Sequence, residues 1–237
     1  MTLRNEIVGT CLKCGRTGYI GTDLCECLLK LRAYNKLVDK GFKKYLLDFV
    51  SESYQEPCYE SGQGFVSYYL ANILEVENKG LSLYLFSRER GRGKTTLTHY
   101  LAYRIASMFS STDTYRRETS LSFGFETASA LMRGESDKRF ATYYVLDDLG
   151  TEDRGGYKRD QWLSVLQETL HHRRDNKLPT IITSNYSPKD LSVLYLGVLD
   201  SLLEISAGGT FQGSLFRQIE LGGPTDLRIS EDSEWPI

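Results

Sequence analysis

Residues 90–96 have the composition of a loop that binds phosphate groups. The segment reads Arg-Gly-Arg-Gly-Lys-Thr-Thr and follows an alternating apolar run at 81–86. In such a loop, backbone N–H groups and the amino end of the next helix face the anion. We expect Lys94 to reach the terminal phosphates and the Thr95 hydroxyl to bind Mg²⁺. The residues expected to hold the nucleotide here are Gly91, Arg92, Gly93, Lys94, Thr95 and Thr96.

A second segment, residues 143–150, supplies acidic groups that a phosphate site needs. The loop alone is ambiguous, because the full pattern G-x-x-x-x-G-K-[ST] has a glycine where this chain has Arg88, and a basic surface turn fits as well. The second segment is an apolar strand that ends in Asp147 and Asp148. Asp147 would hold the Mg²⁺ shell and Asp148 would orient or activate the attacking water. An Asp pair at a strand end is also typical of a helix N-cap, but the two segments together predict a nucleoside-triphosphate site.

A third apolar segment, residues 178–185, ends on Asn185. The carboxyl ends of parallel strands line the ligand crevice of an open α/β sheet. Asn185 would therefore lie beside the γ-phosphate and the attacking water. An asparagine at this place is also a common turn former, so its role depends on the other two segments.

These side chains require a parallel sheet flanked by helices, and the sequence predicts one. Strands are expected at 81–86, 121–125, 143–150 and 178–185, with a helix after the second strand at 126–133. Two further helices are predicted from apolar residues at helical spacing. The first has the expected buried face Leu97, Leu101, Ile105 and Met108. The second spans residues 160–174, with the stripe Trp162, Leu163, Val165, Leu166, Thr169 and Leu170.

Four cysteines near the amino terminus form a separate chemical group. They come in two close pairs: Cys11 and Cys14, then Cys25 and Cys27. Four thiolates in two close pairs suit a tetrahedral structural Zn²⁺ with no open position for catalysis. A disulfide pair or a redox dithiol is the alternative, but the first ten residues lack the apolar core of a secretory signal. Zinc in a reducing cytoplasm is therefore the favoured prediction, and Cys58 is left outside the set.

Composition fits a globular protein with an uneven distribution of charge. The chain of 237 residues is 41% hydrophobic and 25% charged, and its formal net charge is −2. Residues 1–47 hold nine basic and four acidic residues, whereas the rest holds 20 basic and 27 acidic ones. No apolar run is long enough to span a bilayer. An acidic main part argues against a broad DNA-binding face, so any contact with single-stranded DNA is expected in a narrow groove of an assembled oligomer.

The basic excess falls on residues 28–47, where lysines and Arg32 interleave with leucines. This pattern predicts a basic amphipathic helix that docks on a partner protein or follows a phosphate backbone. A solvated linker helix gives the same pattern. The alternatives remain open on the sequence alone.

Two blocks of sequence resemble a known family. They are Asp-Asp-Leu-Gly-Thr-Glu at 147–152 and Arg-Arg-Asp-Asn-Lys-Leu-Pro-Thr-Ile-Ile-Thr-Ser-Asn at 173–185. Both are similar to the replicative-helicase loaders of the DnaC/DnaI type, to which IstB-type transposition helper ATPases are closely related. The likeness covers about residues 78–220. It implies an AAA+ P-loop ATPase domain with a reduced lid at 48–237, after a zinc module and basic linker helix at 1–47 that bind the partner.

The same resemblance implies further site residues. Arg217, in the segment 213–219, matches the arginine that one AAA+ subunit donates to the γ-phosphate of its neighbour, and Arg228 matches a second nucleotide-sensing arginine. Asp148 stands where many AAA+ proteins have glutamate, which implies slow hydrolysis. The implied catalytic set is Lys94, Asp147, Asp148, Asn185 and Arg217.

Three functions are compatible with these features. The favoured one is a cytoplasmic, ATP-dependent loader that self-associates through its AAA+ seams, binds a DnaB-type replicative helicase and places it on single-stranded DNA. The implied cofactors are ATP, Mg²⁺ and Zn²⁺. The second is an IstB-type transposition helper that binds double-stranded DNA, against which the zinc module speaks. The third is a nucleotide-binding adaptor with little hydrolysis, which Arg88 and Asp148 favour.

Overall fold

The computed structural model describes residues 8–52, 54, 65–109, 121–134, 138–151, 159–197, 199, 216–221 and 227–228. The chain forms two compact units: a first unit of residues 1–55 and 99–123, and a second unit of residues 56–98 and 124–237. The predicted division at residue 47 stays a prediction. Cys58, Glu152 and residues 213–215 lie outside the described residues, and the reduced lid stays a prediction.

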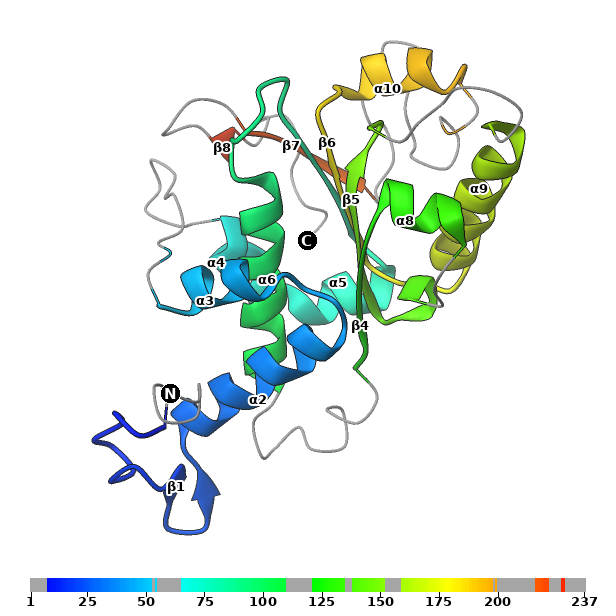
Figure 1. Cartoon of the computed structure of the whole chain (residues 1–237). Helices are drawn as coiled ribbons and strands as arrows, with labels where there is room; N and C mark the ends of the chain where they lie inside the picture. Colours follow the sequence, from blue (N-terminus) through cyan, green and yellow to red (C-terminus); the bar gives the residue numbers. More distant parts are fainter. Residues whose placement is uncertain are drawn as a thin grey trace. The chain divides into compact units, whose positions relative to one another are not determined.

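The first unit begins with a short hairpin and two helices. Strands β1 (Tyr19–Ile20) and β2 (Asp23–Leu24) pair antiparallel. Helices α2 (Glu26–Asp39) and α3 (Lys44–Glu52) follow (Figure 1). The single helix expected over 28–47 is therefore wrong. Gly41 adopts a left-handed φ of 91°, a conformation that a helix interior excludes, and it separates the two helices.

A buried histidine ties the turn between α2 and α3 to the helix that completes this unit. The Nε2 atom of His99 accepts a hydrogen bond of 2.9 Å from the backbone N–H of Lys43. The His99 ring also packs edge-on against Phe42, with ring centroids 5.2 Å apart. Both rings are buried. The turn is thus held by packing and by one hydrogen bond to an imidazole.

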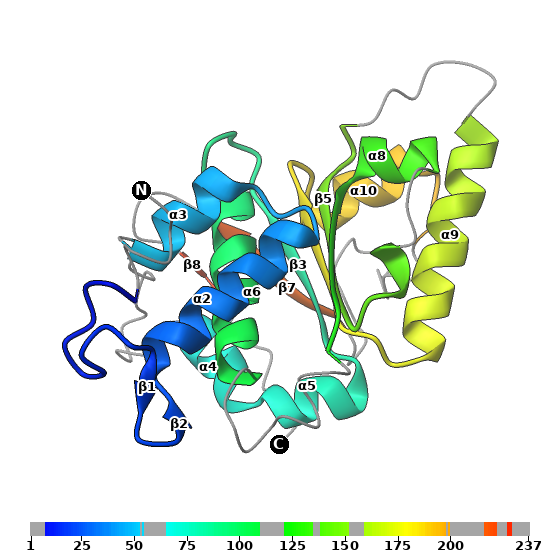
Figure 2. The ribbon, with the colours of Figure 1, turned by 60° about the horizontal axis from the view of Figure 1, so that its bottom comes forward.

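The second unit is built on a six-stranded sheet in the order β4-β5-β6-β3-β7-β8 (Figures 1 and 2). Strands β5, β6, β3 and β7 pair in parallel, and β8 is antiparallel to β7. The carboxyl ends of the four parallel strands therefore share one edge. The strand bounds are β3 Ser82–Phe86, β4 Phe123–Thr127, β5 Tyr143–Leu149, β6 Thr180–Ser184, β7 Phe216–Leu221 and β8 Leu227–Arg228.

Helices cover the sheet, so its central strands are buried on both faces. Every residue of β3 and β6 is buried, as expected for parallel strands between helical layers. Residues of α8, α9 and α10 pack with alternate residues of β3, β5 and β6 in one core cluster, and Figure 2 shows α8 and α9 together on one side of the sheet. The helix bounds are α4 Phe65–Ala71, α5 Ile73–Lys79, α6 Lys94–Phe109, α8 Ala128–Arg133, the short 3₁₀ helix η2 Lys138–Phe140, α9 Arg159–Asp175 and α10 Pro188–Leu194.

Most of the expected helix faces are confirmed. In α9, the side chains of Trp162, Leu166 and Leu170 are buried in the core cluster. In α6, the expected face is buried at its first three positions, but the Met108 side chain is 42% exposed, so that expectation is wrong. The face continues at the buried Phe109 instead, because a spacing of four residues keeps it in line with Ile105.

A buried arginine fixes the edge at which the parallel strands begin. Arg173, in α9, is 1% exposed. Its Nε donates to the Thr180 hydroxyl at 2.7 Å. Its two terminal nitrogens donate to four backbone carbonyls, those of Arg139, Ala141, Thr142 and Pro179. All five N–H donors of an arginine are thereby used, and α9 is tied to the starts of β5 and β6.

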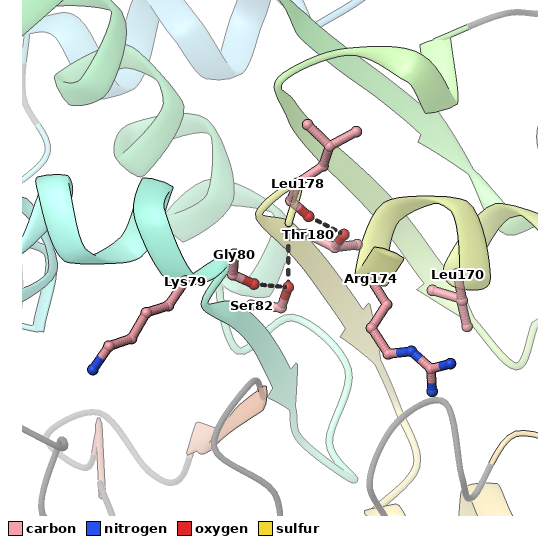
Figure 3. A pocket seen from close by; sticks show the side chains of 7 residues that line it. All are labelled: Lys79, Gly80, Ser82, Leu170, Arg174, Leu178 and Thr180. Atoms are coloured by element: carbon pink, nitrogen blue, oxygen red, sulfur yellow. Dashed lines mark hydrogen bonds between the residues drawn. The ribbon is translucent and has the colours of Figure 1, made fainter. Parts of the chain in front are cut away.

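A small pocket opens at the same edge, between the starts of β3 and β6 (Figure 3). Among the groups that line it, the Ser82 hydroxyl accepts from the Thr180 N–H at 3.0 Å and donates to the Gly80 carbonyl at 3.2 Å. Because the phosphate-binding loop leaves β3 at its other end, this pocket does not belong to the predicted nucleotide site.

Among the helices of the described residues, none is long and apolar enough to cross a membrane.

Candidate nucleotide and zinc sites

The loop after β3 has the backbone shape that its glycines predict. Gly91 and Gly93 adopt left-handed φ values of 78° and 77°, a region that glycine enters at little cost. The Gly93 carbonyl accepts the first helical hydrogen bond, from the Leu97 N–H at 2.8 Å. Helix α6 therefore begins at Lys94, and its amino end lies at the loop, where free N–H groups attract an anion.

Lys94 brings together the loop and the end of β6. Its ammonium donates to the Asn185 side-chain oxygen at 2.9 Å, and carbonyl oxygens of Ser87 and Glu89 lie at 3.4 and 3.5 Å. The residue is 6% exposed. Burial lowers the pKa of Lys94, and the negative charges of Asp148 and Asp147 oppose that shift. The predicted neighbours Lys94 and Asn185 thus meet at one point.

The buried carboxylate of Asp147 joins the other two segments. Its Oδ1 accepts hydrogen bonds from the Thr95 hydroxyl at 2.9 Å and from the Thr183 hydroxyl at 2.7 Å. A carboxylate and a hydroxyl that face each other are oxygen ligands of the kind that Mg²⁺ binds with its waters. The residues present therefore fit the predicted metal. Thr96 is half-buried beside them.

Asp148 occupies an unusual backbone conformation at the end of β5. Its φ is 60°, in the left-handed region that non-glycine residues seldom adopt. The pairing of β5 with β6 shifts register between Leu146 and Leu149, so an irregularity is built into the strand here. The Asp148 N–H donates to the Thr183 hydroxyl at 2.9 Å, and the Thr151 hydroxyl donates to the Asp148 carbonyl at 2.7 Å.

Two further contacts of the β6 end were not predicted from the sequence. The Ser184 hydroxyl donates to the Leu149 carbonyl at 2.6 Å. A Cβ atom at Gly150, whose φ is 101°, would lie 2.6 Å from the Tyr186 ring, so only glycine fits there. The only sequence signal was that Thr183 and Ser184 interrupt an apolar strand, which by itself does not identify a partner.

Arg88 contacts α10 rather than closing the loop. Its guanidinium lies 3.4 Å from the Asp190 carboxylate, and its side chain is 72% exposed. Asp190 also forms a reciprocal capping box with Ser187 at the start of α10. The Ser187 hydroxyl, and then the Arg88 charge, lower the pKa of Asp190. Arg92 forms an ion pair with Glu89 within the loop.

The two arginines implied by the family resemblance lie on strands of the sheet. Arg217 pairs in register with Leu83, near the start of β3, whereas the loop leaves β3 after Phe86. Arg228 pairs with Glu220 on the outer strand β8. Glu220 itself pairs with Phe86, so Arg228 lies two strands away from the end of β3 and level with it, whereas Arg217 lies level with the first half of β3. Their roles stay predictions.

The four amino-terminal cysteines converge on one point in the first unit. Their sulfur atoms all lie within 4.8 Å of one another. The Cys11 and Cys25 sulfurs are 3.8 Å apart, and those of Cys14 and Cys27 are 3.6 Å apart. Tetrahedral Zn²⁺ with Zn–S bonds of about 2.3 Å would separate its sulfurs by roughly 3.8 Å. The cluster therefore fits zinc without rearrangement.

The surroundings of the cysteines also suit thiolate ligands. The Gly18 N–H donates to the Cys14 sulfur at 3.2 Å. Burial alone would raise the pKa of Cys14, but this N–H and the neighbouring thiols outweigh it and lower the pKa to about 6. Burial and the same neighbours raise the pKa of Cys27. A cation is needed to keep all four sulfurs charged at such short separations.

Comparisons with known proteins agree with the motifs of the sequence. No protein-family model matches the chain. Over 119 residues it is 31% identical to the replicative helicase loader DnaI of Bacillus subtilis (strain 168), a stretch that covers 48% of this chain and 36% of that protein. The match thus spans only about a third of the curated relative's length.

Solved structures give a looser match. A crystal structure of DnaI is 19% identical, with a TM-score of 0.42 over 93% of this chain and 92% of that one. The crystal structure of the DnaC helicase loader is 18% identical, with a TM-score of 0.42 over 76% of this chain and 100% of that one. TM-scores of this size are too low to support an assignment of fold or function.

The fold is assigned instead from the strand order of the sheet and from the contacts of Lys94 and Asp147. Within the described residues, the predicted parallel α/β sheet with a phosphate-binding loop and the small cysteine-rich module are confirmed. Over about half of its length, this chain is similar to a DnaI-type replicative helicase loader, which confirms the resemblance that its sequence motifs indicate.

Proposed function

We propose that the second unit binds ATP with Mg²⁺ at the loop after β3 and hydrolyses it slowly. The observation that carries this proposal is the contact between Thr95 and Asp147, 2.9 Å apart although 52 residues separate them in the chain. Beside it, Lys94 meets Asn185. These two contacts support the proposal, because phosphoryl transfer needs a loop lysine, a metal-binding carboxylate and a polar group that orients the water close together.

In this proposal each side chain has one task. Lys94 would bind the terminal phosphates, and Thr95 and Asp147 would hold Mg²⁺, which would offset the charge of the phosphate oxygens. Asp148 would accept a proton from the attacking water while the oxygen of that water forms a bond to the γ-phosphorus. The bond from that phosphorus to the bridging oxygen breaks, which gives ADP and inorganic phosphate. Asn185 would orient the water, and Arg217 of a neighbouring subunit would stabilise the charge that develops.

We propose further that the cysteine cluster binds one structural Zn²⁺ and that the first unit serves partner binding. Four convergent sulfurs support the metal. Basic residues of α2, such as Lys30 and Arg32, are exposed and leave this part of the chain positive. A small module of this kind needs a metal because its apolar core is too small to fold alone.

The whole chain would then act in the cytoplasm as an ATP-dependent loader of a replicative DNA helicase onto single-stranded DNA. The similarity to DnaI supports this assignment. ATP at the seam between subunits would favour a state that holds the helicase ring open, and hydrolysis would release it. An adaptor with little hydrolysis is the second candidate, favoured by the short carboxylate of Asp148.

Nucleotide binding is the first part of the proposal to test. Titration of a fluorescent ATP analogue with Mg²⁺ should give saturable binding to the wild type. Lys94→Ala should weaken it at least about tenfold, because a charge-assisted contact to phosphate is lost. Lys79→Ala is the matched control, since Lys79 is an exposed lysine of the same unit at the opposite edge of the sheet. Equal affinity of both variants would refute the site.

A further inference from the structure

One hydroxyl group lies between the two carboxylate residues of β5 and contacts both. Thr183 Oγ1 donates to Asp147 Oδ1 at 2.7 Å and accepts from the Asp148 N–H at 2.9 Å. Thr183 and Asp147 are both 0% exposed. Only a hydroxyl can serve both partners, because one needs a donor and the other an acceptor at the same atom.

The contact stabilises a backbone conformation that would otherwise be unfavourable. Asp148 has a φ of 60°, and a non-glycine residue in this region persists only where its surroundings hold it. Regular pairing of β5 with β6 is interrupted between Leu146 and Leu149. The acceptor of the Asp148 N–H is therefore the Thr183 side chain.

This conformation determines where the Asp148 carboxylate lies. Asp148 directly follows Asp147, whose carboxylate contacts the loop residue Thr95, and the negative charge of Asp148 acts to raise the pKa of Lys94. Thr95 and Thr183 both donate to the same Asp147 oxygen, which fixes the orientation of that carboxylate as well. One residue of β6 thus sets the positions of two acidic groups on β5.

We infer that Thr183 is a positioning residue of the nucleotide site: its hydroxyl holds Asp147 toward Thr95 and keeps the Asp148 backbone turned so that its carboxylate faces the attacking water. The inference rests on the proposed ATPase function and deepens it. Thr183 itself touches neither nucleotide nor metal in this account. Its loss should impair the chemical step and leave nucleotide binding by the loop intact.

The substitution Thr183→Val tests this with little change of shape, because valine replaces the hydroxyl by a methyl group and suits a buried strand. Thr183→Ser keeps the hydroxyl and should behave as the wild type. Thr169→Val is the matched control: Thr169 is equally buried, and its hydroxyl donates to the Val165 carbonyl within α9 at 2.8 Å, remote from the carboxylates in sequence and contacts.

We expect Thr183→Val to lower kcat for ATP at least about tenfold, as misplacement of a catalytic group does. Nucleotide affinity should change less than about threefold, because the loop and Lys94 are untouched. Thr183→Ser and Thr169→Val should keep the wild-type kcat. An unchanged kcat in Thr183→Val, or an equal loss in Thr183→Ser, would overturn the inference.

Amide hydrogen exchange at Asp148, followed by NMR, separates this inference from the proposed function. Thr183→Val should speed exchange at the Asp148 N–H, because its acceptor is lost, and Thr183→Ser should not. If the wild type does not hydrolyse ATP, the ATPase proposal fails by itself, and the exchange rate still decides whether Thr183 holds Asp148. An unchanged exchange rate in Thr183→Val would refute the positioning role.

Discussion

Arg88 occupies the position at which the phosphate-binding pattern has its first glycine, and its backbone does not need one. The φ angle of Arg88 is not positive, whereas Gly91 and Gly93 both adopt positive φ values. The Arg88 side chain extends to Asp190 and is largely exposed. The missing glycine therefore leaves the loop shape intact, and the departure from the pattern concerns the surface next to the site.

Arg88→Gly should accordingly have little effect. An exposed ion pair contributes less than about 1 kcal/mol to the free energy of unfolding. The affinity for ATP analogues should stay within about twofold of the wild type, since no phosphate contact is lost. Isothermal titration calorimetry measures that affinity, with Arg88→Lys as the variant that keeps the charge. A tenfold loss in Arg88→Gly alone would mean that the guanidinium binds phosphate or an adjoining subunit.

The individual site residues differ in how far sequence predicts them. Lys94 and Asp147 were predicted because loop and strand motifs fix the residue type at a defined point of the chain. Thr183 and the fit between Gly150 and Tyr186 were not predicted. Each depends on a partner across the sheet, and a side chain that acts through a tertiary contact leaves no periodic signal.

At the scale of elements, Arg173 links α9 to the starts of β5 and β6. Its five hydrogen bonds are to a hydroxyl and to carbonyls, with no carboxylate among these partners. Its guanidinium also lies 5.0 Å from the centroid of the Tyr144 ring. Burial lowers the pKa of Arg173 to about 9, although the Tyr144 charge would act to raise it. The side chain therefore stays charged at neutral pH.

Arg173→Met should destabilise the second unit strongly. Methionine keeps much of the aliphatic volume but leaves buried carbonyls without a donor, at a cost of at least about 3 kcal/mol in the free energy of unfolding. Urea denaturation monitored by circular dichroism measures this. Arg174→Met, at the neighbouring position, is the control and should cost less than about 1 kcal/mol. Similar midpoints for the two variants would contradict the role assigned to Arg173.

The cysteine cluster permits a second test at this scale. Purified protein should contain about one equivalent of zinc per chain, and Cys14→Ser should lose most of it because one thiolate ligand is removed. Cys58→Ser is the control, since its position in the sequence leaves it outside the motif. Zinc content is measured by atomic absorption. Less than about half an equivalent in the wild type would refute the four-thiolate site.

Element prediction succeeded where burial dominates and failed where a single residue interrupts a pattern. The strands β3, β5 and β6 were predicted from apolar runs, and α9 from its apolar stripe. The break at Gly41 was missed because apolar periodicity continues across it. The strand order was not available from sequence periodicity, since it depends on which edges pair in three dimensions.

At the scale of the whole molecule, two units with different chemistry lie in one chain. The first contains the cysteine cluster and the basic helix α2, and the second contains the proposed nucleotide site. In the proposed function, the first unit binds the helicase, and the second unit binds ATP or ADP and differs between these two states. Binding to the helicase should therefore depend on which nucleotide is present.

The most direct test is a pull-down of the replicative helicase from the same organism by the full chain, with ATP, with ADP and with no nucleotide. The chain should capture the purified helicase, and the captured amount should differ between ATP and ADP. The Lys94→Ala variant should lose that difference, whereas Lys79→Ala should keep it. Failure to capture the helicase in any nucleotide state would contradict the central claim that this chain is a helicase loader.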